Sequence, residues 1–180
     1  MGERLAGKIA IVTGAGSRGP GVGNGKAAAI LMAREGARVL CVDAQKSNAD
    51  DTVISIRAEK GHNNVGIESR QTLMDTTEQE WDRVMVVNLK SMLLATQAAV
   101  PALERRGGGA ITCVSSVAAL RGAGRTAYAA AKAGVLGFVV SVAIQLAPKA
   151  IRVNAIAPGK ARWITGQTLV VDGRLTLTTR

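Results

Sequence analysis

The chain has 180 residues, of which 47% are hydrophobic and 2% aromatic, and its formal net charge is +10. This length and hydrophobic content predict a single globular α/β domain, residues 1–180, with a core built from aliphatic side chains. Because the basic residues are dispersed and almost no aromatic side chains could stack on bases, we expect no nucleic-acid partner.

The first predicted elements are a strand at 8–13, a glycine-rich loop at 14–25, a helix at 26–35 and a strand at 38–42. This order is the first half of a dinucleotide-binding fold. Its glycines allow a sharp turn and let the backbone approach a pyrophosphate, to which the helix N-terminus offers N–H groups. The loop residues that we predict to bind the cofactor are Gly14, Ser17, Gly21, Gly23 and Gly25.

The closing glycines of this loop allow two registers. Counting back from the helix favours Gly23-Asn24-Gly25, whereas the loop itself suggests Gly21-Val22-Gly23. Asp43 ends the second strand, where a carboxylate can accept hydrogen bonds from both adenosine ribose hydroxyls and repels the extra phosphate of NADP. The predicted cofactor is therefore NAD, although Arg18 in the loop could contact phosphate.

The next predicted element is a helix at 46–60, with Val53, Ile54 and Ile56 as a partial apolar face. The turn at 61–66 would suit the end of a strand, yet no strand precedes it. The only histidine, His62, has no second ligand or base nearby, so we predict a structural role and no metal site.

A long helix is predicted at 77–106, capped by Thr77 with Glu80 three residues later and interrupted by Pro101. Asn88 is a polar residue in its apolar pattern. This amide could satisfy a backbone carbonyl or hold a water molecule in an active site.

The second half of the chain contains strands at 110–114, 151–156 and 168–171, and a helix at 126–146. Ser115 and Ser116 follow the first of these strands. On the helix, Tyr128 and Lys132 share one face, where the ammonium would favour the phenolate form of the tyrosine. Such a phenol can exchange a proton with an alcohol or ketone.

Together these motifs resemble the classical short-chain dehydrogenases/reductases over nearly the whole chain. The matching stretches are TGAGSRGPGVGNG, VLCVD, NNVG, VVNLKS, VSS, YAAAK, IRVNAIAPG and WITGQTLVVDG. The resemblance implies a Rossmann-type, doubly wound parallel sheet, a nicotinamide cofactor, and catalysis by a serine, tyrosine and lysine assisted by an asparagine.

By motif match the catalytic tyrosine, lysine and asparagine are Tyr128, Lys132 and Asn88. The strand and the following Val-Ala-Ala-Leu select Ser116 as the serine, whereas the usual spacing from the tyrosine selects Ser115. The resemblance adds further cofactor-binding residues, namely Asn64, Gly66, Tyr128, Lys132, Pro158 and Gly159.

The chain departs from the family in length, since family members run to roughly 250 residues as one domain. Near 61/62 the segments for the third and fourth strands and the helix between them are missing. Near 159–162 the segment that covers the substrate and the helix before the last strand are missing. A sheet without its middle strand would leave backbone N–H and C=O groups unpaired.

The resemblance implies an NAD(P)-dependent enzyme that interconverts a secondary alcohol and a ketone, with a small-molecule substrate and a homotetrameric assembly. The alternative is a catalytically impaired, truncated protein that binds nucleotides or other proteins. We expect no membrane partner because no apolar run approaches the length of a membrane span. Without a signal peptide, and with Cys41 and Cys113 in buried strands, the protein is expected in the cytoplasm.

Overall fold

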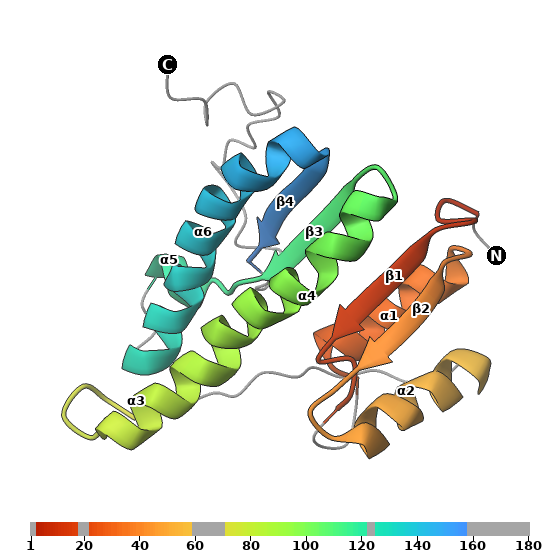
Figure 1. Ribbon diagram of the computed structural model, residues 1–180. Helices are drawn as coiled ribbons and strands as arrows, with labels where there is room; N and C mark the ends of the chain where they lie inside the picture. The colour runs from red at the N-terminus through yellow and green to blue at the C-terminus, as the bar shows by residue number, and fades with distance from the viewer. Residues whose placement is uncertain (1–2, 18–21, 59–70, 122–124, 158–180) are drawn as a thin grey trace. The chain divides into compact units, whose positions relative to one another are not determined.

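The computed structural model describes residues 3–17, 22–58, 71–121 and 125–157. They belong to two compact units, residues 1–66 and residues 67–180 (Figure 1). Within the described residues, each unit contains one two-stranded parallel sheet. That residues 1–180 make a single domain stays a prediction.

The first unit contains a strand, helix, strand, helix sequence. Its elements are β1 (Ile9–Thr13), α1 (Asn24–Arg34), β2 (Arg38–Val42) and α2 (Lys46–Ala58). The two strands pair in parallel, with Ile9 opposite Arg38 and Thr13 opposite Val42. A parallel pair requires a crossover connection, which α1 provides.

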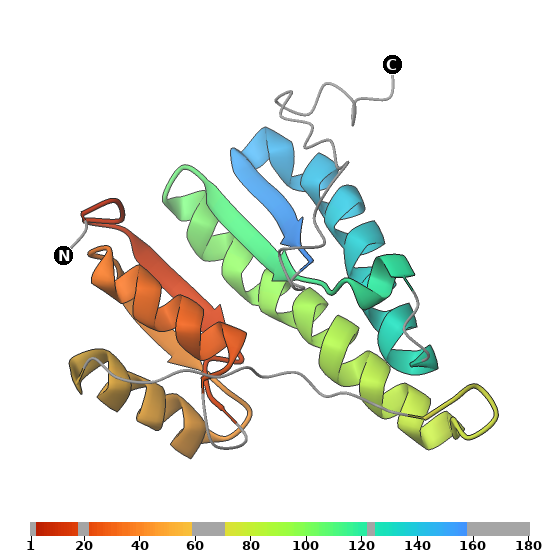
Figure 2. The same ribbon diagram turned by 180° about the vertical axis from the view of Figure 1, so that it is seen from behind.

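The sheet of the first unit is covered by helix α1 on one face only, as the views from the front and from behind show (Figures 1 and 2). Successive side chains of a strand point to opposite faces. The uncovered face therefore carries large apolar side chains that are 40–56% exposed, namely Ile9, Ile11, Leu40 and Val42. Both faces of a parallel sheet are normally buried, and among the described residues of this unit no second helical layer covers this face.

The second unit begins with one long helical stretch. It comprises α3 (Glu78–Met85), the π-helical turn η1 (Val86–Lys90) and α4 (Ser91–Arg105). Thr77 caps it as predicted, because the Thr77 hydroxyl oxygen accepts a 3.2 Å hydrogen bond from the Glu80 backbone N–H. Pro101 lies inside α4 without ending the helix.

The rest of the second unit forms its sheet and the helix packed on it. The elements are β3 (Gly109–Val114), α5 (Ala118–Arg121), α6 (Thr126–Leu146), the 3-10 turn η2 (Ala147–Lys149) and β4 (Ile151–Ile156). β3 and β4 pair in parallel, with Gly109 opposite Ile151 and Val114 opposite Ile156. Their buried side chains pack against α6 in the main core cluster, which consists of Cys113, Val135, Val139, Leu146, Ile151 and Val153.

The partial apolar face predicted for α2 is confirmed only in part. Val53 and Ile56 are half-buried, whereas Ile54 is 60% exposed and the adjacent Thr52 is fully buried.

The expectation that no apolar run approaches the length of a membrane span is wrong. Among the described residues, two helical stretches, Glu78–Arg105 and Thr126–Lys149, are long and apolar enough to cross a membrane by length and composition. A core helix of a soluble protein passes the same test, and Val135 of the second stretch packs in the core.

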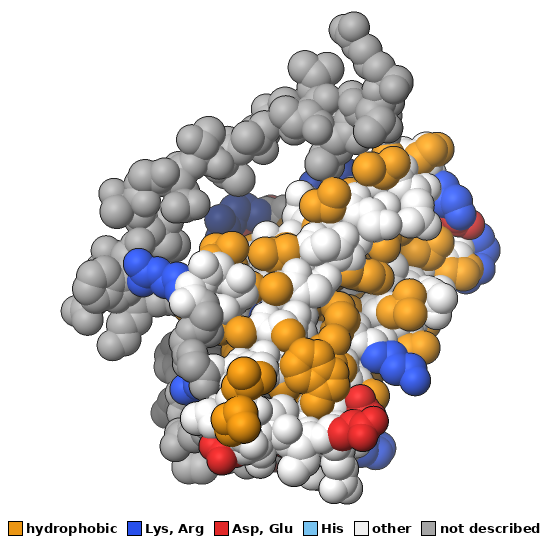
Figure 3. All heavy atoms as spheres, turned by 90° about the vertical axis from the view of Figure 1, so that its left-hand side faces the viewer, with side chains coloured by type: hydrophobic (Ala, Val, Ile, Leu, Met, Phe, Trp, Pro, Cys, Tyr) orange, Lys and Arg blue, Asp and Glu red, His pale blue; other side chains and the backbone are white. Residues whose placement is uncertain are grey.

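The helices of the second unit also expose apolar side chains. Figure 3 shows hydrophobic side chains distributed over the side of the molecule that faces left in Figure 1. Independently of the view, the large apolar side chains of α3, η1, α4 and α6 that are at least 36% exposed are Trp81, Val86, Val87, Leu93, Leu94, Val140 and Ile144. Apolar groups in such numbers on a helical surface are typical of an interaction face.

Candidate active site

The glycine loop begins with a close contact between two of the predicted cofactor-binding residues. Gly14 has a φ of +66°, a conformation that other residues rarely adopt. A Cβ atom on Gly25, in the first turn of α1, would lie only 2.0 Å from the Gly14 carbonyl oxygen. Gly25 therefore lets the start of α1 approach the end of β1, as the closing glycine of a dinucleotide-binding loop does.

The N-terminus of α1 is also held by the loop. Gly23 is the N-cap residue, and its N–H donates a 3.0 Å hydrogen bond to the Ser17 hydroxyl oxygen. With Gly23 at the cap and Gly25 in the first turn, the described residues fit the register Gly23-Asn24-Gly25. Gly21 lies outside the described residues.

Asp43 lies directly after β2, and its carboxylate faces the glycine loop. One carboxylate oxygen accepts a hydrogen bond from Gly16 N–H at 2.9 Å, and the other accepts one from Gln45 N–H at 3.0 Å. A Cβ atom on Gly16 would lie 2.2 Å from the Asn48 Cβ atom, so only glycine fits there. The described part of the loop thus fits the adenosine diphosphate portion of a dinucleotide, with a helix N-terminus for phosphate and a carboxylate for ribose.

Thr52 supports the same loop and was not predicted from the sequence. Its side chain is fully buried, and its hydroxyl oxygen lies 2.7 Å from the Ala15 carbonyl oxygen and 3.1 Å from that of Asn48. The hydroxyl therefore ties α2 to the residue beside Gly16. A polar residue next to the apolar run at 53–56 is the only signal that the sequence offers for this role.

In the second unit, Tyr128 and Lys132 lie on one face of α6, as predicted. The Lys132 Nζ atom is 5.8 Å from the centre of the Tyr128 ring. Lys132 is only 7% exposed, and its ammonium donates a 2.9 Å hydrogen bond to the Val114 carbonyl oxygen at the end of β3. Burial lowers the pKa of Lys132, because the charged form loses contact with water.

The two candidate serines have different environments. The Ser115 side chain is 3% exposed, and its hydroxyl donates a 2.7 Å hydrogen bond to the Lys132 carbonyl oxygen. Ser116 is partly exposed, and its hydroxyl oxygen accepts a 3.2 Å hydrogen bond from Ala118 N–H. That bond uses a lone pair, so the Ser116 hydroxyl keeps its proton to donate, whereas the Ser115 proton is engaged.

Asn88 is buried in the π-helical turn η1 between α3 and α4. Its side-chain amide donates a 3.0 Å hydrogen bond to the Val84 carbonyl oxygen. Val84 is itself fully buried against Ala127 and Ala131 of α6, and Tyr128 packs on the same cluster. Isolated π-helical turns occur often at functional sites, and this one brings the predicted asparagine to the helix that carries the tyrosine and lysine.

The structure therefore places the predicted residues in two groups, each within its own unit. Gly14, Ser17, Gly23, Gly25 and Asp43 belong to the first unit, and Asn88, Ser115, Ser116, Tyr128 and Lys132 belong to the second. Asn64, Gly66, Pro158 and Gly159 lie outside the described residues, as do His62, Arg18 and the strand predicted at 168–171. Within the described ranges, no three His, Cys, Asp or Glu side chains gather to hold a metal ion.

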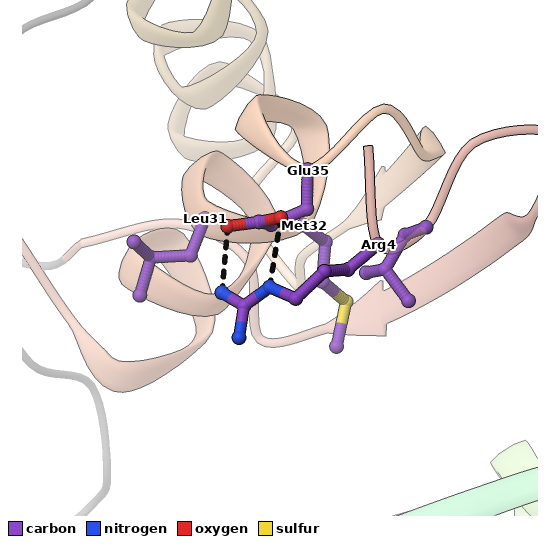
Figure 4. A pocket seen from close by; sticks show the side chains of 5 residues that line it. Arg4, Leu31, Met32 and Glu35 are labelled. Atoms are coloured by element: carbon purple, nitrogen blue, oxygen red, sulfur yellow. Dashed lines mark hydrogen bonds and ion pairs between the residues drawn. The ribbon is translucent and has the colours of Figure 1, made fainter. Parts of the chain in front are cut away.

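A shallow hollow of about 320 Å³ lies elsewhere in the first unit. It is lined by Arg4, Leu5, Leu31, Met32 and Glu35, with two hydrogen bonds joining Arg4 to Glu35 (Figure 4). These residues surround the C-terminal end of α1, whereas the glycine loop is at its N-terminal end. The hollow is therefore separate from the cofactor-binding loop.

Comparison with known proteins identifies relatives of this chain. A family model described as short chain dehydrogenase matches residues 61–166. A 3-oxoacyl-(acyl-carrier-protein) reductase from Thermotoga maritima is 36% identical over 87% of this chain and 75% of its own. The human dehydrogenase/reductase SDR family member 4 is 31% identical over 94% of this chain and 72% of its own.

Solved structures show the same relationship. A protein from Burkholderia xenovorans, described as a short-chain dehydrogenase/reductase, matches 87% of this chain and 76% of its own, with 35% identity and a TM-score of 0.79. A dehydrogenase from Agrobacterium tumefaciens with bound NADP matches with 33% identity and a TM-score of 0.74, over 86% of this chain and 72% of its own. The predicted α/β Rossmann-type fold is thereby confirmed.

Proposed function

The chain belongs to the short-chain dehydrogenase/reductase family of NAD(P)-dependent oxidoreductases, and we propose that it interconverts a secondary alcohol and a ketone. The observation that carries this proposal is the position of the Lys132 ammonium, which lies beside the Tyr128 ring and bonds to the last residue of β3. Ser116 lies two residues after the end of this strand. A phenol, an ammonium and a hydroxyl in this arrangement suit proton exchange at a single substrate oxygen.

Each residue has a distinct part in the proposed reaction. In the direction of reduction, the Tyr128 hydroxyl donates its proton to the substrate oxygen, and in the reverse direction the phenolate removes the alcohol proton. The positive charge of Lys132 stabilises that phenolate. The free proton of Ser116 forms a hydrogen bond to the same oxygen. When bound, the nicotinamide cofactor donates or accepts the hydride.

Asn88 has a supporting role in this proposal. Its amide is bonded to the Val84 carbonyl oxygen inside the π-helical turn, which packs against α6. We propose that a backbone or side-chain oxygen at Asn88 holds a water molecule. This water molecule would relay protons between solvent and the Tyr128–Lys132 pair.

We propose NAD as the preferred cofactor. The support is the Asp43 carboxylate, which accepts a hydrogen bond from Gly16 N–H and, if it binds the adenosine ribose, would repel a 2′-phosphate. The NADP in the Agrobacterium neighbour makes this preference a question for binding measurements. Asn64, Gly66, Pro158 and Gly159 are proposed to contribute to the nicotinamide end through the family motifs.

The proposed substrate is a small alcohol or ketone, and the proposed assembly is a homotetramer. Family members usually form oligomers, and the exposed apolar side chains of α4 and α6, such as Leu94 and Ile144, support an interface on these helices. Both cysteines are free thiols in the structure, which supports a reducing compartment such as the cytoplasm.

A second candidate is a nucleotide-binding or interaction protein without turnover. The observation in its favour is that the described residues of each unit form a sheet of only two strands. The aligned relatives also carry additional residues, since the 189-residue alignment to the Thermotoga reductase takes in only 87% of the 180 residues here. A chain shortened in this way could keep the glycine loop but lose catalysis.

The two candidates are distinguished by an assay on the full chain. NADH and NADPH binding is measured by fluorescence, and turnover is followed by NADH absorbance with a panel of ketones, sugars, steroids and acyl thioesters. The intact mass is checked first, against 18.6 kDa for this sequence. Cofactor binding together with turnover supports the oxidoreductase, and cofactor binding alone supports the second candidate. A chain that shows no binding and no turnover would contradict both candidates.

A further inference from the structure

We infer that Ser115 is a positioning residue that holds Lys132 in place, and that it is distinct from the serine that contacts substrate. This inference rests on the proposed function, because it concerns the same site. It starts from two consecutive residues that both form a hydrogen bond with Lys132: Val114, the last residue of β3, and Ser115, which follows it.

The two bonds hold opposite ends of the lysine residue. Ser115 Oγ donates to the Lys132 backbone carbonyl oxygen at 2.7 Å, and Lys132 Nζ donates to the Val114 carbonyl oxygen at 2.9 Å. The first bond fixes the helix backbone relative to the strand end, and the second fixes the ammonium. These two bonds hold a long, flexible lysine side chain in one geometry.

Ser115 is itself fixed by the neighbouring strand. Its backbone N–H donates a 2.7 Å hydrogen bond to the Ile156 carbonyl oxygen at the end of β4. Because the side chain is 3% exposed, water does not compete for its hydroxyl. Ser115 thus links the carboxyl ends of β3 and β4 to the α6 residue that carries the ammonium.

The Ser115 bond is additional to the α6 backbone ladder. Lys132 lies inside the helix, where its carbonyl oxygen can accept a helical hydrogen bond with its other lone pair. Removing the Ser115 hydroxyl therefore does not strip that carbonyl of every partner. The expected consequence is a shift of Lys132 relative to the strand end, so that its ammonium gains contact with water.

The direct test is NMR titration of the Lys132 side chain in protein labelled at lysine Cε, with the signal assigned by its loss in Lys132→Met. In Ser115→Ala we expect the titration midpoint to rise toward that of an exposed lysine, by roughly half a pH unit or more. Ser116→Ala, at the adjacent residue, is the matched control and should leave the midpoint at the wild-type value.

Kinetics provide a second readout. Ser115→Ala should lower kcat roughly tenfold with little change in KM, because a misplaced group costs rate more than binding. If Ser115→Ala does not fold, Ser115→Cys keeps a side chain of similar size with a weaker donor, and the same rise in midpoint is expected. If the wild-type protein shows no turnover, the proposed function is contradicted. The Lys132 titration would still decide the role of Ser115, because it does not depend on activity. An unchanged Lys132 midpoint in the folded Ser115 variants would overturn the inference.

Discussion

The ammonium nitrogen of Lys132 lies 5.8 Å from the centre of the Tyr128 ring, one turn away along α6. The same ammonium donates a hydrogen bond to the Val114 carbonyl oxygen, and Lys132 as a residue is only 7% exposed. This pair ties the chemistry of the site to the packing of α6 on β3, and four predictions follow from it and from the glycine loop.

Tyr128→Phe removes the phenol hydroxyl and keeps the ring in its contact with the Val84 cluster. We expect turnover to fall at least about 100-fold, the usual cost of losing a general acid or base. NADH affinity should change less than about twofold, since the ring stays in place. Steady-state kinetics and fluorescence titration measure both, and full turnover in this variant would remove Tyr128 from the mechanism.

Lys132→Met removes a buried ammonium whose pKa burial lowers below its ordinary value of 10.5. Below the lowered pKa, the wild type bears the full cost of burying the charge. Between that pKa and 10.5, the unfolded chain keeps a proton that the folded chain has released, so wild-type stability rises with pH. Turnover should fall at least about 100-fold at all pH values.

Because Lys132→Met has no such titration, its stability relative to the wild type should be greatest near neutral pH and should decline as pH rises toward 10.5. Urea unfolding at a series of pH values measures this difference. A difference that does not depend on pH would show that Lys132 titrates alike in the folded and unfolded chains.

Asp43→Asn removes the negative charge next to Gly16 while keeping an oxygen that can accept a hydrogen bond. We expect NADP affinity to rise and NAD affinity to fall, with the ratio of the two changing about tenfold, or roughly 1.4 kcal/mol. Fluorescence titration with both reduced cofactors measures the ratio. Asp50→Asn, an exposed acidic residue paired with Lys46, is the control and should leave it unchanged.

Thr52→Val replaces a fully buried hydroxyl with a methyl group of similar size. The Ala15 carbonyl oxygen then loses its 2.7 Å hydrogen bond, at an expected cost of about 1–3 kcal/mol in the free energy of unfolding. Ser55→Ala removes a bond of the same length to the Asp51 carbonyl oxygen in an exposed setting and should cost less than about 0.5 kcal/mol. Equal effects of the two substitutions, measured by urea unfolding, would mean that Thr52 has no special role at the loop.

Local patterns identified most elements and several site residues. The apolar runs and glycines gave β1, α1 and β2 in the right order, and the bounds of α6 and β4 agree with the prediction to the residue. Thr77 was predicted as a cap because a hydroxyl three residues before Glu80 can bond locally. Such signals are readable because they depend on residues within one or two turns.

Other features depend on contacts between distant residues. Thr52 was not predicted as a buried residue of α2, yet it is fully buried because its hydroxyl bonds to the Ala15 carbonyl oxygen, 37 residues away. The π-helical turn around Asn88 also has no local signature in the apolar pattern. Val84, four residues before Asn88, packs against Ala127 and Ala131 of α6.

The sequence alone determined the family, the order of strands and helices, and the positions of Tyr128 and Lys132 on one helical face, because motif spacing and periodicity are properties of neighbouring residues. Only the tertiary structure decided that the Ser115 hydroxyl is engaged with Lys132 while Ser116 keeps its proton. The physical reason is that hydrogen bonds across elements depend on how helices and strands pack. No spacing along the chain specifies which of two adjacent hydroxyls is buried.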